Sequence, residues 1–369
     1  MPNLLCLEQQ TLSSPIPTDV TGWQRQGHSR GVRAGANLAV TLSICLFARA
    51  AGAQTASIPY DHMPEIAPLG VRVDKHIDVP EFAKGPAIDP AKGYRTQRLG
   101  RNLYMVTDNV YQSMFLVHET GVVVVDAPPT YAALIPKAIA EVTDKPITHL
   151  VYSHSHTDHI GGTSSLGAHP VIIAHEETKK LLVRANDPNR PVPTVTFTDA
   201  YALKVGTEML ELSYHGNGHE PGNIFIYAPA QKTLMVVDVI FPGWMMWRRF
   251  AAAQDIPGVF DQVKMIKSFD FDTLVAGHVM RTRADVELQS EFMNDVKAAA
   301  GTALKSTPVG VGVDPRDMAN PWAVFGNYID RVVIQCVNAL TPKWSGKLAG
   351  FDVFIWDQCY AMEQSLRID

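Results

Sequence analysis

One twelve-residue stretch constrains this 369-residue chain more than any other. Residues 151–162 read VYSHSHTDHIGG, which places three histidines and one aspartate within six positions, directly after an apolar run and before two glycines. Where such a pattern leaves a strand, His154 and His156 can point into one cavity while Asp158 and His159 point to a neighbouring position. Imidazole and carboxylate groups suit zinc and other divalent first-row metals. The stretch therefore predicts a metal site at the end of a buried strand.

Three later residues are further candidate ligands, and each lies at the end of a predicted strand. His219 lies in HGNGHEPGN, Asp238 ends TLMVVD, and His278 ends TLVAGH. A buried carboxylate such as Asp238 is costly unless it is paired or bound to a metal. Together with the first motif, these residues give five histidines and two aspartates. That set is enough for two metal ions that share one carboxylate and a bridging hydroxide.

Short β-branched runs alternate with helix-like segments along the middle of the chain. Residues 103–108, 114–119, 121–127 and 148–153 have the pattern of buried strands, and residues 131–143 carry apolar side chains at helical spacing. From Asp285 onward, long helical patterns dominate. The order predicts an α/β sandwich in which helices cover two sheets. We expect an N-terminal arm over residues 54–94, a catalytic domain over 95–285 and a helical C-terminal extension over 286–369 that packs on it.

The first 53 residues have the pattern of a secretory signal segment. Arg30 and Arg33 precede an apolar run over residues 34–48, and small residues then provide a cleavage site near Ala53 and Gln54. Fifteen apolar residues are too few to span a bilayer comfortably. We therefore expect a periplasmic or secreted protein with no stable membrane insertion after cleavage. The polar residues 1–29 do not fit such a signal and are consistent with a start codon assigned too early.

Composition and charge narrow the partners of the chain. The formal net charge is −5 with no basic block, so the pattern of a nucleic-acid-binding protein is missing and a small-molecule substrate is expected. After cleavage only Cys336 and Cys359 remain. In an exported protein they could form a disulfide, or remain two free thiols. The sequence also leaves open whether the protein is a homo-oligomer.

The ordered motifs HSHTDH, GHEPGN, VVD and AGH resemble those of the metallo-β-lactamase superfamily, over roughly residues 95–285. The resemblance implies an αββα sandwich with a dinuclear site at the sheet edge. It also implies that two Zn²⁺, or other divalent first-row ions, are held by seven residues. The first ion would be held by His154, His156 and His219, the second by Asp158, His159 and His278, with Asp238 bridging the two. Asp126 matches a family aspartate that supports the loop.

Departures from individual family branches narrow the expected reaction. One class of β-lactamases has a cysteine at the position of Asp238, which disfavours β-lactam cleavage. Many lactonases have a tyrosine at the position of Phe241, so the contribution of that tyrosine to oxyanion stabilisation is not expected here. Family oxygenases replace His156 by glutamate, which disfavours a redox iron site. Glyoxalase II-like enzymes act on an intracellular thioester, which does not fit an exported chain.

We therefore expect an exported dinuclear zinc hydrolase that cleaves an ester or lactone bond of a hydrophobic small molecule. A metal-bridging hydroxide would attack, and Asp158 would orient it and carry its proton. The alternatives are a phosphotriester or sulfate-ester hydrolase, then a β-lactamase, then a non-enzymatic binding protein on the same scaffold.

The aromatic segment VIFPGWMMWRRF directly follows Asp238. Its proline-glycine pair predicts a loop that leaves the metal site. One interpretation is a wall of the substrate cleft formed by Phe241, Trp244, Met245 and Trp247, since ligand pockets are lined by aromatic groups. The other is a loop whose aromatic side chains are buried under the C-terminal helices.

The remaining histidines are assigned simpler roles. His215 is a candidate neighbour of the ligands. His118, His149, His169 and His175 are expected on the surface or in loops.

Overall fold

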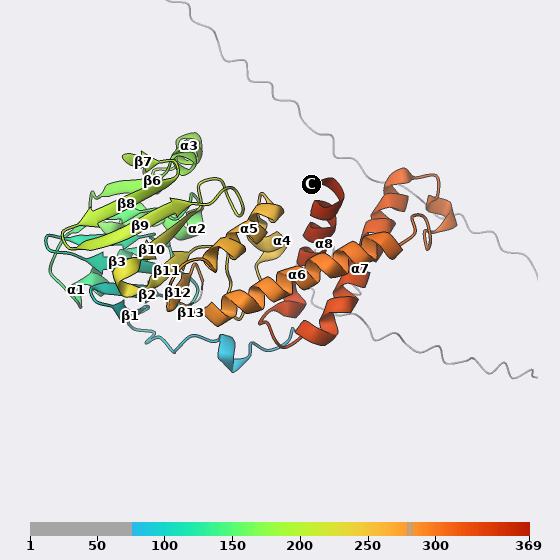
Figure 1. Cartoon of the computed structure of the whole chain (residues 1–369), viewed down its shortest axis with the longest axis horizontal. Helices are drawn as coiled ribbons and strands as arrows, with labels where there is room; N and C mark the ends of the chain where they lie inside the picture. The colour runs from blue at the N-terminus through green and yellow to red at the C-terminus, as the bar shows by residue number, and fades with distance from the viewer. Residues whose placement is uncertain (1–75, 279, 282) are drawn as a thin grey trace, which may run out of the picture. The chain divides into compact units, whose positions relative to one another are not determined.

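The structure, a computed structural model, describes residues 76–278, 280–281 and 283–369, so the predicted signal segment lies outside the described residues. The chain forms two sheets, which lie on the left in Figure 1. The first has the strand order β1-β2-β3-β4-β5-β6-β7, and the second β13-β12-β11-β10-β9-β8. The strands of the first sheet are β1 Arg95–Gly100, β2 Leu103–Thr107, β3 Gln112–Val117, β4 Val122–Val125, β5 Ile147–Val151, β6 Val171–His175 and β7 Val195–Phe197. Those of the second are β8 Ala200–Val205, β9 Glu208–Tyr214, β10 Ile224–Ala228, β11 Thr233–Val236, β12 Thr273–Ala276 and β13 Met280–Arg281.

Eight α-helices accompany the two sheets in the described residues. They are α1 Ile135–Ala140, α2 Thr157–Ile160, α3 Glu176–Ala185, α4 Arg248–Ala252, α5 Ile256–Ile266, α6 Arg283–Ser306, α7 Pro321–Trp344 and α8 Phe351–Ile368. The predicted helix over residues 131–143 is shorter than expected, because Pro136 lies at the start of α1 and a 3₁₀ turn, Ala132–Leu134, precedes it.

Three hydrophobic clusters define the layers of the fold. One lies between the sheets and contains Val123 and Val125 of β4 together with Met235 and Val237 from the β11 segment. The alternate residues Val122 and Val124 point to the opposite face, where they pack with α1 and α2. This period of two follows from the pleat of a strand, whose successive side chains point to opposite faces. The predicted αββα sandwich is confirmed.

The helical C-terminal extension completes the outer layer of the second sheet. Leu234 and Val236 of β11 belong to one cluster with residues of α5, α6, α7 and α8. A disulfide joins Cys336 of α7 to Cys359 of α8, which resolves the choice that the sequence left open. None of the helices in the described part of the chain is both long enough and apolar enough to cross a membrane.

Residues 76–94 run as an arm from the C-terminal helices to β1 (Figure 1). At one end, Asp352 of α8 accepts a hydrogen bond from the backbone N–H of Ile77 at 2.8 Å. Further along, the carbonyl of Ala83 accepts a hydrogen bond from Trp244 Nε1 at 2.9 Å, and the carbonyl of Pro86 accepts one from Asn109 Nδ2 at 2.8 Å. The arm is therefore attached to both the sandwich and the extension.

Candidate metal centre

The HSHTDH stretch begins three residues after β5 ends. β5 pairs in parallel with β4, and β11 pairs in parallel with β12, so the carboxyl ends of each pair meet at one edge. Asp126 follows β4 and is fully buried, and its Oδ1 accepts a hydrogen bond from the backbone N–H of Ser153 at 2.8 Å. Asp126 thus supports the start of the histidine loop.

The structure brings all seven predicted ligands into two clusters that share Asp238. The first contains His154, His156, His219 and Asp238, and the second contains Asp158, His159, Asp238 and His278. Within each cluster, the potential ligand atoms lie within 4.8 Å of one another. Their role as ligands stays a prediction, but their proximity is a property of the fold.

The separations within the clusters match those that a zinc ion requires. His219 Nε2 lies 3.0 Å from His156 Nδ1 and 3.5 Å from Asp238 Oδ2. In the second cluster, His159 Nε2 lies 3.1 Å from Asp238 Oδ2, and His278 Nε2 lies 3.1 Å from Asp238 Oδ1. Tetrahedral ligands about 2.0–2.1 Å from zinc are roughly 3.3 Å apart. Both clusters therefore have the dimensions of a coordination shell.

The hydrogen bonds of the histidines support the same assignment. The buried Nε2 atoms of His154 and His159 make no hydrogen bond to any described residue, although unpaired buried polar atoms are rare. In His154 and His278 the Nδ1 atom has a polar partner: His154 Nδ1 lies 2.9 Å from Ser153 Oγ, and His278 Nδ1 lies 2.9 Å from the carbonyl oxygen of Val110, whereas His159 Nδ1 has none among the described residues. Metal-binding histidines are oriented in this way, with the second nitrogen bonded to a carbonyl or another polar group.

Burial and neighbouring charges set the protonation states of the site. Burial lowers the pKa of His154 well below its ordinary value and that of His219 to about 4, so both are neutral imidazoles at pH 7. Burial raises the pKa of Asp238, but His159, His278 and His219 outweigh it and hold that pKa well below its usual range. Burial also lowers the pKa of His159, but Asp238, Asp158 and Asp126 raise it more, to about 9. Cation binding at the second cluster would therefore release a proton from His159.

Two residues that the sequence analysis did not single out also shape the site. Glu220, directly after His219, lies with Oε1 3.3 Å from His156 Nε2 and accepts hydrogen bonds from Ser155. A Cβ atom on Gly277 would lie 2.8 Å from Asp238 Oδ1, so a larger residue would displace the carboxylate. Glu220 lies in the motif GHEPGN and Gly277 in AGH, each next to a predicted ligand. Their position beside a ligand could have identified them from the sequence.

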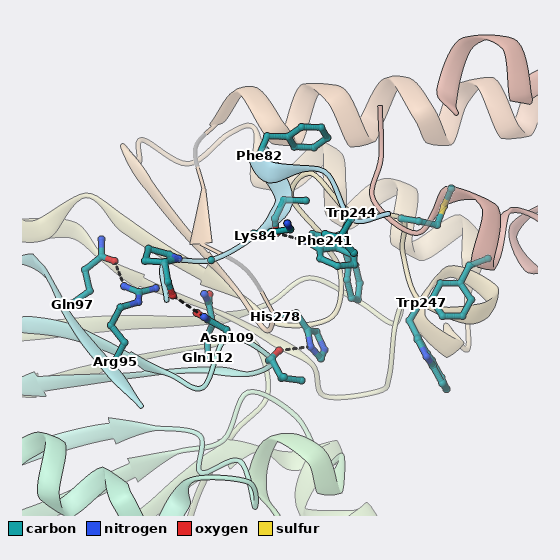
Figure 2. Close-up of a pocket in the computed structure, with 17 residues that line it drawn as sticks. Phe82, Lys84, Arg95, Gln97, Asn109, Gln112, Phe241, Trp244, Trp247 and His278 are labelled. Carbon is teal, nitrogen blue, oxygen red and sulfur yellow. Dashed lines mark hydrogen bonds between the residues drawn. The ribbon is translucent and has the colours of Figure 1, made fainter. Parts of the chain in front are cut away.

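The four residues predicted to bind substrate all line one cavity of about 910 Å³ that extends to His278 (Figure 2). Phe241 is buried and its ring stacks on His278, with 5.5 Å between the ring centroids. Met245 is also buried, in the cluster beneath the C-terminal helices, whereas Trp247 is 53% exposed. The segment thus lines a cavity and also contributes buried side chains to the core beneath the C-terminal helices, and its role in binding a substrate stays a prediction.

The remaining histidines differ in part from expectation. His118 and His175 are both buried; His118 lies in the loop after β3, as expected, whereas His175 ends β6, so its assignment to the surface or a loop is wrong. His118 follows β3 and bonds to Thr148 Oγ1 at 3.0 Å, and His175 ends β6 against the ring of Tyr214. His215 packs against Phe225 and Phe269 and bonds to Ser213. The burial and the neighbours of a single histidine depend on long-range packing, which the hydrophobic periodicity of the sequence does not predict.

Comparison with known families agrees with this geometry. The family model of the metallo-beta-lactamase superfamily matches residues 107–278, which include all seven candidate ligands. Residues 107–278 therefore form a domain of the metallo-beta-lactamase superfamily. Members of the metallo-beta-lactamase superfamily are metal-dependent hydrolases, and the two clusters are the groups that could bind the metal.

Individual relatives are distant. The chain is 26% identical over 247 residues to the 2,4-dinitroanisole O-demethylase subunit alpha of Nocardioides sp. (strain JS1661), covering 61% of this chain and 71% of the relative. It is 27% identical over 154 residues to a metallo-beta-lactamase type 2 of Elizabethkingia meningoseptica, covering 38% of this chain and 60% of that enzyme. A solved metallo-beta-lactamase structure from Pontibacter korlensis aligns with a TM-score of 0.47 at 17% identity, covering 54% of this chain and 97% of that one.

Proposed function

We propose that this protein is an exported dinuclear zinc hydrolase that cleaves an ester or lactone bond of a hydrophobic small molecule. The observation that carries the proposal is the shared carboxylate of Asp238. Its Oδ2 lies 3.5 Å from His219 Nε2 in the first cluster, and its Oδ1 lies 3.1 Å from His278 Nε2 in the second. A single structural zinc site is closed by four ligands and has no need of seven.

Two bound divalent ions would supply a hydroxide at neutral pH and a Lewis acid for the carbonyl oxygen of the substrate. The residues of this chain would do the rest. The side chain of Asp158 is 44% exposed and lies 3.5 Å from His159 Nε2, so its carboxylate can accept a proton from water and return it to the leaving group. Phe241, Trp244, Met245 and Trp247 would hold the apolar part of the substrate beside His278.

Two further observations support parts of the proposal. The Cys336–Cys359 disulfide fits an oxidising compartment, which agrees with export. The name of the Nocardioides relative gives removal of an O-linked methyl group from 2,4-dinitroanisole, a small aromatic molecule. That name makes an aryl methyl ether a second candidate substrate beside an ester or lactone.

Metal analysis combined with one substitution tests the proposal. The purified protein should carry about two zinc or similar ions per chain, and a chelator should abolish hydrolysis until metal is restored. Asp238→Asn should lose metal from at least one cluster and lower kcat at least about a hundredfold. Asp144→Asn, at an exposed position, is the matched control and should retain both metals. An Asp238→Asn variant with two metals and wild-type turnover would contradict the proposal.

The bond that is cleaved requires a panel of substrates. Lactones, aryl esters, an aryl methyl ether, phosphotriesters, sulfate esters and β-lactams should be compared on the metal-loaded protein at equal concentrations. We expect the highest kcat/KM for an aryl ester or lactone. A preference for any other member of the panel would reassign the substrate, and no hydrolysis of any member would favour a binding protein.

A further inference from the structure

The cavity beside His278 has walls from several separate parts of the chain. The arm contributes Phe82 and Lys84, β1 contributes Arg95 and Gln97, and the aromatic segment and α8 close the opposite side (Figure 2). Much of the lining is apolar, as in Val79, Val110, Met245 and Phe354. This composition is typical of a small-molecule pocket with few polar groups that fix orientation.

The charges of the lining all have one sign. Arg95 and Lys84 carry the permanent positive charges, and none of the described residues that line the cavity is an aspartate or a glutamate. Lys84 pairs with the exposed carboxylate of Glu81. Arg95 differs, since no carboxylate in the described part of the chain forms an ion pair with its guanidinium. Arg95 is therefore the cation that is available to a ligand.

The guanidinium of Arg95 is only partly satisfied by the protein. Its Nη1 donates a hydrogen bond to Gln97 Oε1 at 2.6 Å, but its Nε is buried and makes no hydrogen bond to any described residue. Burial lowers the pKa of Arg95, which reflects the cost of removing its charge from water. A partly buried charge without a carboxylate partner is less favourable than a paired one, and an anion that binds it with two parallel hydrogen bonds offsets that cost.

The strand register places Arg95 at a fixed distance from the candidate metal centre. Arg95 is paired with Thr107, and Thr107 with Gln112, so the three residues form one row across β1, β2 and β3. The N–H of Gln112 donates a hydrogen bond to the carbonyl of Gly277 at 2.8 Å, and His278 follows. Neighbouring strands are about 4.8 Å apart, so the backbones of Arg95 and Gly277 are separated by roughly 14 Å.

We propose that the cavity selects a hydrophobic anion, whose carboxylate is bound by Arg95 while the bond to be cleaved lies beside His278. The apolar part of the molecule spans the distance between them, on the order of 10 Å once the Arg95 side chain reaches into the cavity. The buried Oε1 of Gln112, which has no hydrogen-bond partner among the described residues, lies in the same row between the two ends. This inference rests on the proposed function, because it names the class of substrate for the same site.

Binding of two probes to the metal-loaded protein tests the inference without catalysis. Decanoate and 1-decanol have the same chain length and differ in charge, and their binding can be followed by isothermal titration calorimetry. We expect wild-type protein to bind decanoate at least about tenfold more tightly than 1-decanol, as expected for hydrogen bonds to a charged group. Arg95→Gln should remove that difference and leave the affinity for 1-decanol unchanged.

Two control variants separate the possible outcomes. Arg98→Gln changes an exposed arginine of the same strand and should leave both affinities at wild-type values. Arg95→Lys keeps the charge but loses the paired donors, so it should restore part of the preference. Equal binding of both probes by wild-type protein would overturn the inference, and this result does not depend on how well Arg95→Gln folds. Unchanged decanoate affinity in Arg95→Gln would also overturn it.

A kinetic comparison keeps this inference distinct from the proposed function. The monophenyl ester of sebacic acid carries a free carboxylate, and its methyl phenyl diester does not. We expect Arg95→Gln to raise KM for the monoester at least about tenfold with little change in kcat, and to leave both constants for the diester unchanged. Hydrolysis of both esters with equal KM by wild-type and Arg95→Gln protein would retain the proposed function and reject the role of Arg95.

Discussion

Both carboxylate oxygens of Glu220 bind Ser155, the residue between the first two histidines of the metal motif. Oε2 accepts the backbone N–H of Ser155 at 2.9 Å, and Oε1 accepts its hydroxyl at 2.8 Å. Both residues are buried. Since Oε1 also lies 3.3 Å from His156 Nε2, Glu220 fixes the loop and the ring orientation together.

Replacing Glu220 by glutamine should weaken metal binding. The amide keeps the shape of the side chain but presents an N–H₂ group where Ser155 requires an acceptor. We expect Glu220→Gln to lower metal affinity about 10- to 100-fold, the usual effect of losing a partner of a ligand. Competition with a chromogenic chelator measures this change. Glu211→Gln, on the exposed face of β9, should behave as wild type, and equal affinities in all three proteins would remove Glu220 from this role.

Trp247 should contribute to the binding of bulky substrates. Its side chain lines the cavity and is 53% exposed, so a bound aromatic group would cover it. We expect Trp247→Ala to raise KM for a bulky aryl ester roughly tenfold, and to spare a small ester and both metals. Trp322→Ala is the matched control, because Trp322 is 82% exposed on α7 and does not line the cavity. An equal loss of activity on large and small esters would show that Trp247 stabilises the fold and does not contact the substrate.

His118 should make the fold sensitive to acid. Burial lowers the pKa of His118 from its ordinary 6.5, and His149 and Lys145 lower it further. Below about pH 6.5 the unfolded chain binds a proton that the folded chain binds less well, so stability falls as the pH falls through that value. We expect His118→Gln to show a smaller loss of unfolding free energy between about pH 7.5 and 5.5 than wild type. Urea titrations at both pH values measure it, and His169→Gln, at an exposed site, should retain the wild-type slope.

The short segment labelled α4, directly after Trp247, is not a regular right-handed helix but a turn with four consecutive non-glycine residues in the left-handed region. Arg249, Phe250, Ala251 and Ala252 have φ values from 54° to 61°. This conformation costs about 1–2 kcal/mol per residue for L-amino acids other than glycine. Gln358 of α8 holds the turn, because its Oε1 accepts the N–H of Phe250 at 2.8 Å and its Nε2 donates to the carbonyl of Met246 at 2.7 Å.

Glycine at position 252 should therefore be tolerated or stabilising. Ala252 is exposed, so its replacement removes little packing. We expect Ala252→Gly to leave the free energy of unfolding unchanged or to raise it by up to about 1 kcal/mol. In contrast, Ala298→Gly on the exposed face of α6 should lower it by about 1 kcal/mol. A comparable loss in both variants would indicate that the turn is not left-handed in solution.

The sequence by itself determined the layers of the fold and the chemistry of the site. The run of valines at residues 122–125 predicts a strand buried on both faces, and the pleat of that strand, with its period of two, places Val122 and Val124 on one face and Val123 and Val125 on the other. The motif HSHTDH predicts proximity directly, since residues within six positions of one loop cannot lie far apart. The sequence also places Asp238 and His278 at the ends of two strands, but the parallel pairing of β11 with β12, which brings both residues to one edge, is known only from the structure.

The tertiary structure alone decided the partners of these groups and the walls of the cavity. Trp244 donates to Ala83 across 161 positions of sequence, and Glu220 binds Ser155 across 65. Such contacts depend on how the arm and the loops pack, and hydrophobic periodicity carries no information about them. The same holds for Arg95, whose lack of a carboxylate partner in the described chain is a property of everything that surrounds it. The local sequence pattern therefore specifies which residues can take part in the chemistry, and long-range packing specifies which residues they contact.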